Sequence, residues 1–311
     1  MKSFLIVFAA IIVIAVVLVY ALIPDNIVVS KTVYTNIKPA SVLRCLHDSA
    51  KWQQWFPSKI NIKNDFSYNN EHYILKEQRY ISSDVLISAN NINYPSRINV
   101  IPFGSDSSTM EWQLQFAASN NPFKRIKQYQ SAKELKNNIT ILLDSFKIFI
   151  QKTKNIYGFD IKHTTLMDTA LVSTKTVTKR YPSTQIIYNM VDELKQYIKQ
   201  KHATEHNFPM LNVTQLKNNS YVVMVGIPTN TFLKGTDVIK PKRMIMLKNK
   251  TLVTEVIGDN NTIKKAFKAT TNYMDDNRLT SPVIPFQQLI TDRSKQTDST
   301  KWITKILSPI I

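Results

Sequence analysis

Two histidines of this sequence have a spacing that is known from zinc chemistry. His202 and His206 lie four residues apart in the segment HATEH, with Glu205 beside the second imidazole. On one face of a helix, such a pair can bind zinc while the glutamate acts as a general base. Pro209 follows within three residues, however, and proline ends a helix. We therefore predict a solvated helix end here and expect no metal site.

Other catalytic and cofactor-binding patterns are missing from the sequence. Its five glycines, of which Gly226, Gly235 and Gly258 are isolated, cannot form a phosphate-binding loop. The single cysteine, Cys45, lies in the apolar pattern of a predicted helix and is expected to be a small buried hydrophobic residue. No G-x-S-x-G nucleophile motif occurs. We predict no catalytic residue and no cofactor.

The chain of 311 residues is strongly basic, with 40 Lys and Arg, 22 Asp and Glu, and a formal charge of +18. Such a charge can attract nucleic acid or anionic lipid. Lysine is spread along the chain, however, and the densest cluster, Lys240, Lys242 and Arg243, is interrupted by Pro241. Because no basic run is combined with a recognition motif, no nucleic-acid partner is expected.

The N-terminus is predicted to be a membrane anchor. No charged residue occurs from Phe4 to Ile23, and about 20 helical residues span about 30 Å, the thickness of the hydrocarbon core of a bilayer. We expect a single-pass transmembrane helix within residues 1–25, with the lipid bilayer as its partner. A cleaved signal peptide is the alternative, although its apolar core is usually only about 7–15 residues long. Lysines on both sides leave the orientation open, with a preference for an extracytoplasmic soluble part.

Residues 26–158 have the pattern of an antiparallel sheet that is closed by a long helix. Alternating β-branched residues from Ile27 to Asn36 predict a strand, and Pro39 begins a short helix. Residues 61–118 are predicted to form successive antiparallel strands separated by Asn-Asn and Gly-Ser turns. The capping box Ser131-x-x-Glu134 and apolar residues at helical spacing then predict an amphipathic helix that ends by Gly158.

The segment IVVSKTVYTNIKPASVLRCLHDSAKWQQWFP combines a strand, a helix start at proline and a W-x-x-W-x-P-like element. Through this segment the first region resembles the START-like, polyketide-cyclase-like (SRPBCC) superfamily. The resemblance implies a helix-grip fold in which the long helix and a bent sheet enclose an apolar ligand cavity. Trp52, Trp55 and Trp112 are the candidate lining residues. The alternative, which is more common for large aromatic residues, is that all three pack in the core.

Residues 159–311 contain an internal repeat. Hydrophobic periodicity predicts the order strand, helix, strand, strand in residues 171–227 and again in residues 251–307. Pro182-Ser183 begins the first helix of the repeat, and Asp259 caps the second. Together with the first region, this repeat predicts an α+β protein.

The repeat ends in the segment PVIPFQQLITDRSKQTDSTKWITKILSPI. Mainly through this ending, the repeated unit resembles the gyrase-inhibitor-like (GyrI-like) effector-binding domain. The resemblance implies a groove for a small, often cationic or aromatic, molecule, in which a Glu commonly lies next to a Tyr. The matching residues are Phe286, Gln287, Gln288 and Leu289, and an amide neither stabilises a cation as a carboxylate does nor serves as a base.

Gln287 or Gln288 is therefore expected either to hydrogen-bond a neutral ligand or to be a solvated strand residue, with solvation preferred. The further candidate ligand-binding residues of this region are Tyr188, Phe286 and Trp302.

These regions predict three parts: an anchor (1–25), a START-like domain (26–158) and a GyrI-like domain (159–311). The order of the three looks like an arrangement seen among bacterial proteins. We expect a membrane-tethered protein that binds or senses a hydrophobic, apolar or aromatic small molecule without catalysis. One alternative is a cyclase-like or hydrolase-like enzyme that acts in one of the two cavities. Another is an envelope scaffold with degenerate pockets, which the missing Glu suggests.

Overall fold

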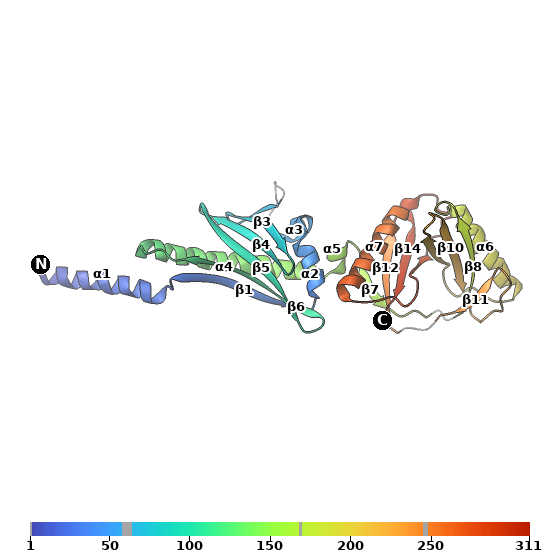
Figure 1. The fold of residues 1–311 in the computed structure, drawn as a ribbon, viewed down its shortest axis with the longest axis horizontal. Helices are drawn as coiled ribbons and strands as arrows, with labels where there is room; N and C mark the ends of the chain where they lie inside the picture. The colour runs from blue at the N-terminus through green and yellow to red at the C-terminus, as the bar shows by residue number, and fades with distance from the viewer. Residues whose placement is uncertain (1, 58–63, 168–169, 245–247) are drawn as a thin grey trace. The chain divides into compact units, whose positions relative to one another are not determined.

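The protein is an α+β chain built on two antiparallel sheets (Figure 1). The computed structural model describes residues 2–57, 64–167, 170–244 and 248–311. The chain divides into two compact units, residues 1–156 (unit 1) and residues 157–311 (unit 2). Each unit contains one of the sheets.

Unit 1 begins with an apolar helix, α1 (Lys2–Leu22), that leads into strand β1 (Asn26–Thr35). Large apolar side chains along α1 are exposed, among them Ile6 at 70%, Phe8 at 55% and Leu22 at 73%. In the part of the chain that the structure describes, no helix has both the length and the hydropathy of a membrane span. The expected transmembrane helix over residues 4–23 is therefore not supported by the structure.

The sheet of unit 1 has six strands in the order β1-β6-β5-β4-β3-β2. The strands after β1 are β2 (Asp65–Tyr68), β3 (Glu71–Arg79), β4 (Ser82–Ala89), β5 (Ile92–Phe103) and β6 (Ser107–Ala117). Asn69, Asn70, Asn90, Asn91 and Gly104 all have positive φ, a conformation that Asn and Gly adopt more readily than other residues. The predicted meander is confirmed, except that residues 61–63 lie outside the described residues.

The helices of unit 1 after α1 are α2 (Pro39–Leu46), α3 (Ser49–Trp55), α4 (Pro122–Ile150) and α5 (Thr153–Tyr157). The long helix α4 packs against β1 and β6, as Figure 1 shows. It begins nine residues earlier than Ser131 because Asn121 is its N-cap: Asn121 Oδ1 accepts hydrogen bonds from the backbone N–H groups of Phe123 and Lys124 at 3.0 and 3.2 Å. The predicted capping box at Ser131 was therefore wrong, since that residue lies inside the helix.

The sheet of unit 2 has eight strands in the order β11-β8-β10-β9-β13-β14-β12-β7. The elements of the first repeat are β8 (Ala170–Thr178), α6 (Thr184–Gln200), β9 (Met210–Gln215) and β10 (Tyr221–Pro228). Those of the second are β12 (Thr251–Ile257), α7 (Asn260–Asn277), β13 (Phe286–Leu289) and β14 (Ile303–Pro309). The order β8-β10-β9 is mirrored by β12-β14-β13, so the predicted repeat is confirmed. The short edge strands β7 (Ile161–Thr164) and β11 (Lys240–Arg243), and the turn η1 (Ser299–Lys301), were not predicted.

Both helices of unit 2 pack on the same face of its sheet. Leu211, Gln287 and Ile306 are register partners across β9, β13 and β14, so their side chains share a face. Leu211 belongs to the apolar cluster of α6, and Ile306 belongs to that of α7. We call this side the helix face and the opposite side the open face.

Candidate ligand-binding site

The three predicted tryptophans of unit 1 lie together in its core. Trp52 and Trp112 are fully buried and Trp55 is 7% exposed. The ring centroid of Trp52 lies 4.8 Å from that of Trp55 and 6.4 Å from that of Trp112, and Phe146 of α4 reaches Trp55 at 4.9 Å. This aromatic cluster occupies the space between the sheet and α4 in which the START-like resemblance places a ligand cavity. The packing favours the core interpretation of these side chains.

A buried carboxyl group lies in the same interior. Glu71, on β3, is 6% exposed; it accepts a hydrogen bond from the Tyr73 hydroxyl and is hydrogen-bonded to Asn138 of α4. Burial raises the pKa of Glu71 above its ordinary value, against the lowering effect of these two hydrogen bonds. The folded unit therefore holds a proton on this carboxyl at pH values where the unfolded chain has lost it.

Unit 1 is expected to lose stability as pH rises above about 4.5, the ordinary pKa of Glu71. The pKa is higher in the folded state, so the folded state binds more protons and the free energy of unfolding falls with rising pH. Glu71→Gln should remove this contribution, because the amide accepts from Tyr73 and carries no charge. Urea unfolding between pH 5 and 8, followed by tryptophan fluorescence, measures the slope. As a control, Glu111→Gln on β6 should show the same pH slope as the wild type. If Glu71→Gln also kept the wild-type slope, Glu71 would not be its source.

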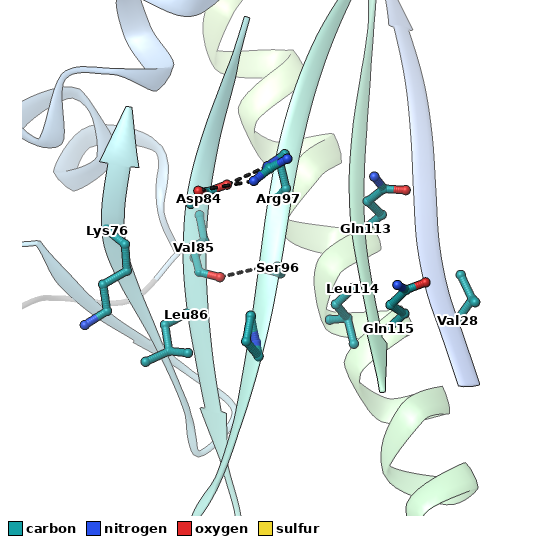
Figure 2. A pocket seen from close by; sticks show the side chains of 11 residues that line it. Val28, Lys76, Asp84, Val85, Leu86, Ser96, Arg97, Gln113, Leu114 and Gln115 are labelled. Carbon is teal, nitrogen blue, oxygen red and sulfur yellow. Dashed lines mark hydrogen bonds and ion pairs between the residues drawn. The ribbon is translucent and has the colours of Figure 1, made fainter. Parts of the chain in front are cut away.

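A shallow cavity of about 440 Å³ lies on the outer face of the sheet of unit 1, turned away from α4 (Figure 2). Its charged centre is an ion pair: Asp84 accepts from Arg97 at 2.6 Å and also from Arg79, which lies outside the lining, at 2.8 Å. The hydrogen bond from Arg97 holds the pKa of Asp84 below its ordinary value. The arrangement is that of a hydrogen-bonded sheet surface, so we do not take it as the ligand site.

In unit 2, three predicted residues meet on the helix face around an arginine that was not predicted. Arg293 donates to Gln287 Oε1 at 3.2 Å, and its guanidinium lies 4.8 Å from the ring centroid of Trp302. The Tyr188 hydroxyl accepts the backbone N–H of Arg293 at 2.7 Å. Tyr188, Gln287, Trp302 and Arg293 are each at most 8% exposed. Burial lowers the pKa of the Arg293 guanidinium from its ordinary value, but this group stays protonated in proteins.

The other two predicted residues, Phe286 and Gln288, alternate with Gln287 along β13 and face the open side. Gln287 and Gln288 are 4% and 7% exposed, so the preferred expectation that they are solvated was wrong. β13 is a central strand, with β9 on one side and β14 on the other, and Gln287 is covered on the helix face by Arg293. The two amides therefore cannot serve one common ligand position.

The open face changes from apolar to charged along one row of register partners. Ser173, Gly226 and Met210 pair across β8, β10 and β9; the row continues through Gln288 to Lys305 and Glu255, which form an ion pair at 3.8 Å. The charged end borders a cavity of about 520 Å³. The apolar end is the floor of a separate cavity of about 640 Å³.

The larger cavity, which we call the open-face cavity, is bounded by apolar segments from several parts of unit 2. Leu166, Met244 and the loop residues 282–284 stand around its floor. Asn212 on the floor donates to the carbonyl of Pro285 at 2.9 Å, which ties that loop to β9. The remaining lining residues are Leu171, Leu211, Met224, Lys242, Arg243, Phe286, Pro309 and Ile311. Ligand sites of this kind, apolar with a few polar groups, usually measure about 300–1,000 Å³.

The HATEH segment is not helical. α6 ends at Gln200, His202 has a φ of 52°, and Glu205 forms an isolated bridge with Thr229. His202 and His206 are both exposed. The segment is solvent-exposed as predicted, but it follows the end of α6 and is not part of the helix.

No protein-family model matches this chain, and no curated protein matches it. Among solved structures, it is similar to the C-terminal domain of EcmrR at 15% identity, covering 49% of this chain and 98% of that one with a TM-score of 0.39. An EcmrR–DNA complex matches at 14% identity, 61% and 72% coverage and a TM-score of 0.43. The Zhui aromatase/cyclase from Streptomyces sp. R1128 matches at 9% identity, 40% and 94% coverage and a TM-score of 0.30. These similarities are weak, and the sites are interpreted from their own geometry.

Sequence reasoning missed Arg293 and most of the open-face cavity. Met210, Met224 and Gly226 alternate with buried aliphatic residues on β9 and β10. This alternation could have indicated that the open face of the sheet is also apolar. The sequence does not tell which strands lie side by side, so it could not bring these residues together.

Proposed function

We propose that this protein binds a small apolar molecule in the open-face cavity of unit 2. The observation that carries the proposal is the cavity itself, about 640 Å³ with a lining of Leu, Met, Phe, Pro, Val and Ile side chains. An apolar molecule of moderate size that enters it would be removed from water, which contributes roughly 25 cal/mol per Å² of buried apolar surface.

Two features of the lining suit a binding site. Met210, Met224 and Met244 come from three separate segments, and their flexible thioether chains can adapt to differently shaped apolar ligands. Gly226 leaves space in the cavity because it has no side chain: a Cβ at this position would lie 3.0 Å from Leu171 Cδ1. The space above Gly226 therefore depends on the absence of a side chain.

The lining supports binding rather than catalysis. Its polar side chains are Ser173, Asn212, Lys242 and Arg243, and none of the described lining residues is a carboxylate, histidine or cysteine. Asn212 is used to hold the loop at Pro285. Such a set offers hydrogen bonds to a ligand but contains, among the described residues, no His, Asp or Glu side chain, the groups that most often act as general bases.

We further propose that residues 26–158 form a START-like domain and residues 159–311 a GyrI-like domain, tethered to a lipid bilayer through α1. The six-stranded sheet with its long helix and the mirrored eight-stranded sheet support the two domain assignments. The exposed apolar side chains of α1 support the tether. The binding unit would then act at a membrane surface, on whichever side the chain is exposed.

Filling the cavity floor should remove binding. In Gly226→Val, the added methyl groups take space beside Leu171 that the ligand would otherwise fill. We expect the affinity for the neutral apolar fluorophore N-phenyl-1-naphthylamine to fall by about tenfold or more, a loss of about 1.4 kcal/mol in binding free energy. Fluorescence titration of the full chain in detergent, with the same detergent without protein as the blank, measures this affinity.

The matched control adds a methylene to the same sheet without entering the cavity. Val177 on β8 is 63% exposed, so Val177→Ile should bind the fluorophore as the wild type does. Equal binding by wild type and Gly226→Val would exclude the open-face cavity. An absence of binding to all three proteins would contradict the proposed function.

A further inference from the structure

We propose that Arg293 makes the helix face of unit 2 a separate binding position for the carboxylate of a small aromatic acid. This position lies on the other side of the sheet from the open-face cavity and does not depend on the function proposed for that cavity. The inference rests on the charge, the hydrogen bonds and the surroundings of one buried guanidinium.

The charge of Arg293 is buried and uncompensated. Its side-chain hydrogen bonds go to neutral oxygens, Gln287 Oε1 at 3.2 Å and Thr304 Oγ1 at 2.8 Å, and within the described residues it forms no ion pair with a carboxylate. The neighbouring Asp292 is engaged elsewhere: it accepts from Ser294 Oγ at 2.6 Å and pairs with Lys295 at 3.5 Å. A buried cation without a partner is costly, which suggests that a partner is supplied from outside the chain.

One donor of the guanidinium is also unused. The Nε–H of Arg293 is inaccessible to solvent and has no hydrogen-bond acceptor among the described residues, although leaving a buried donor without an acceptor destabilises the folded state. A carboxylate can accept from Nε–H and an adjacent terminal N–H together, in the two-bond geometry that guanidinium and carboxylate groups prefer. One ligand group would supply both the missing charge and the missing acceptor.

The other buried arginine, Arg125 of unit 1, shows the compensated case. It is 2% exposed, its Nε donates to the carbonyl of Ile23 at 3.1 Å, and its terminal nitrogen pairs with Asp25 Oδ1 at 2.7 Å. Arg125 thus has both the acceptor and the carboxylate that Arg293 lacks. Arg293 is buried to a similar degree, at 5% exposed, but has no such partner in the described part of the chain. We infer that a ligand supplies it.

The aromatic surroundings of Arg293 suit an aromatic ligand. The guanidinium lies over the ring of Trp302, and Tyr181 is hydrogen-bonded to Gln287. Tyr188, whose hydroxyl is bonded to the backbone N–H of Arg293, also lines a neighbouring cavity of about 650 Å³ beside α6. The cavity lining carries Lys195, Lys295 and His206; of its acidic groups, Glu205 pairs with Lys195, Asp292 pairs with Lys295, and Asp192 is exposed.

The segment between β13 and β14 fixes Arg293 in place. Thr291 N–H donates to the carbonyl of Ile303 at 3.1 Å, and Ile303 N–H donates back to Thr291 Oγ1 at 2.9 Å. The Tyr188 hydroxyl then accepts from the backbone of Arg293 and donates to the carbonyl of Thr291 at 3.1 Å. The backbone of Arg293 is therefore held by contacts that a substitution of its side chain leaves intact.

The test compares three ligands of nearly equal shape: benzoate, neutral benzamide and cationic benzylamine. Calorimetric titration of the full chain in detergent should show benzoate binding about tenfold or more tightly than the other two, as expected for a charge-assisted pair. Arg293→Met should lower the benzoate affinity to the benzamide level. Arg293→Lys, which keeps the charge but loses the two-bond geometry, should fall between them.

Two further measurements keep the test decisive. Gly226→Val should bind benzoate as the wild type does, which separates this position from the open-face cavity. If Arg293→Met does not fold, quenching of tryptophan fluorescence by benzoate, present in the wild type and lost in Trp302→Phe, locates the site. Equal affinity for the three ligands, no binding, or unchanged benzoate binding in Arg293→Met would each overturn the proposal. The proposal would also be overturned if Arg293→Ala bound guanidinium ion while the wild type did not bind benzoate. That result would mean that the Arg293 side chain itself occupies a cation site.

Discussion

Replacement of Trp52 by alanine is expected to lower the free energy of unfolding by about 3–5 kcal/mol, the cost of removing a large aromatic side chain from a packed core. Trp52 is fully buried, and its ring lies 5.3 Å from that of Phe66 and 6.1 Å from that of Phe56. Its Nε1–H donates to the carbonyl of Leu46 at 2.9 Å, so the substitution also leaves a buried carbonyl without this donor. Urea unfolding followed by circular dichroism measures the loss.

The control is an aromatic residue of the same unit that makes no core contact. Tyr80 is 95% exposed, and Tyr80→Ala should change the free energy of unfolding by less than about 0.5 kcal/mol. The result also separates the two interpretations of the tryptophans. If Trp52→Ala retained the stability of the wild type but lost binding of an apolar probe, Trp52 would be a lining residue and the core interpretation would be wrong.

Local patterns in the sequence were sufficient to predict most elements of the fold. Ile27, Val29 and Val33 alternate with exposed residues along β1, and the positive φ of the Asn-Asn turns follows from residue type alone. The two repeats of unit 2 were predictable because each helix and each central strand has its own periodicity. The helix start at Pro122 was missed because the capping box at Ser131 was preferred to the Asn121-Pro122 pair, which is an equally local signal.

The candidate sites depend on strand register, which the sequence does not contain. Gly226 and Met210 are 16 positions apart in sequence, yet they are paired in the sheet. Gln287 and Gln288 are adjacent and chemically identical, but register places the first beside Ile306 on the helix face and the second beside Lys305 on the open face. Arg293 is charged and lies outside any strand, so its sequence context predicts exposure; its burial results from the fold of the segment between β13 and β14.

The second large effect concerns α1. The described part of α1 exposes twelve large apolar side chains, and the transfer of each such side chain out of water is worth about 1.5–3 kcal/mol. Removal of residues 1–22 is therefore expected to move the protein from the membrane fraction to the supernatant. The shortened chain starts at Ile23, because Arg125 of α4 donates to the carbonyl of Ile23 and pairs with Asp25, and both groups are then kept. The deletion also removes Tyr20, which donates to the carbonyl of Asn120 and whose ring centroid lies 4.9 Å from the Arg125 guanidinium. The shortened protein should therefore still fold and should unfold at a slightly lower urea concentration than the full chain.

A substitution within the full-length chain tests the same property without truncation. Val13→Lys combined with Val17→Lys places two charges in the middle of α1, each costing about 2.5–3.5 kcal/mol in a bilayer, and should release the protein as the truncation does. Extraction of membranes at alkaline pH, followed by immunoblotting of pellet and supernatant, measures the distribution. N-terminal sequencing of the mature protein distinguishes a retained helix from a cleaved signal peptide. A full chain that remains in the supernatant, or a truncated chain that stays in the pellet, would show that α1 is not the tether.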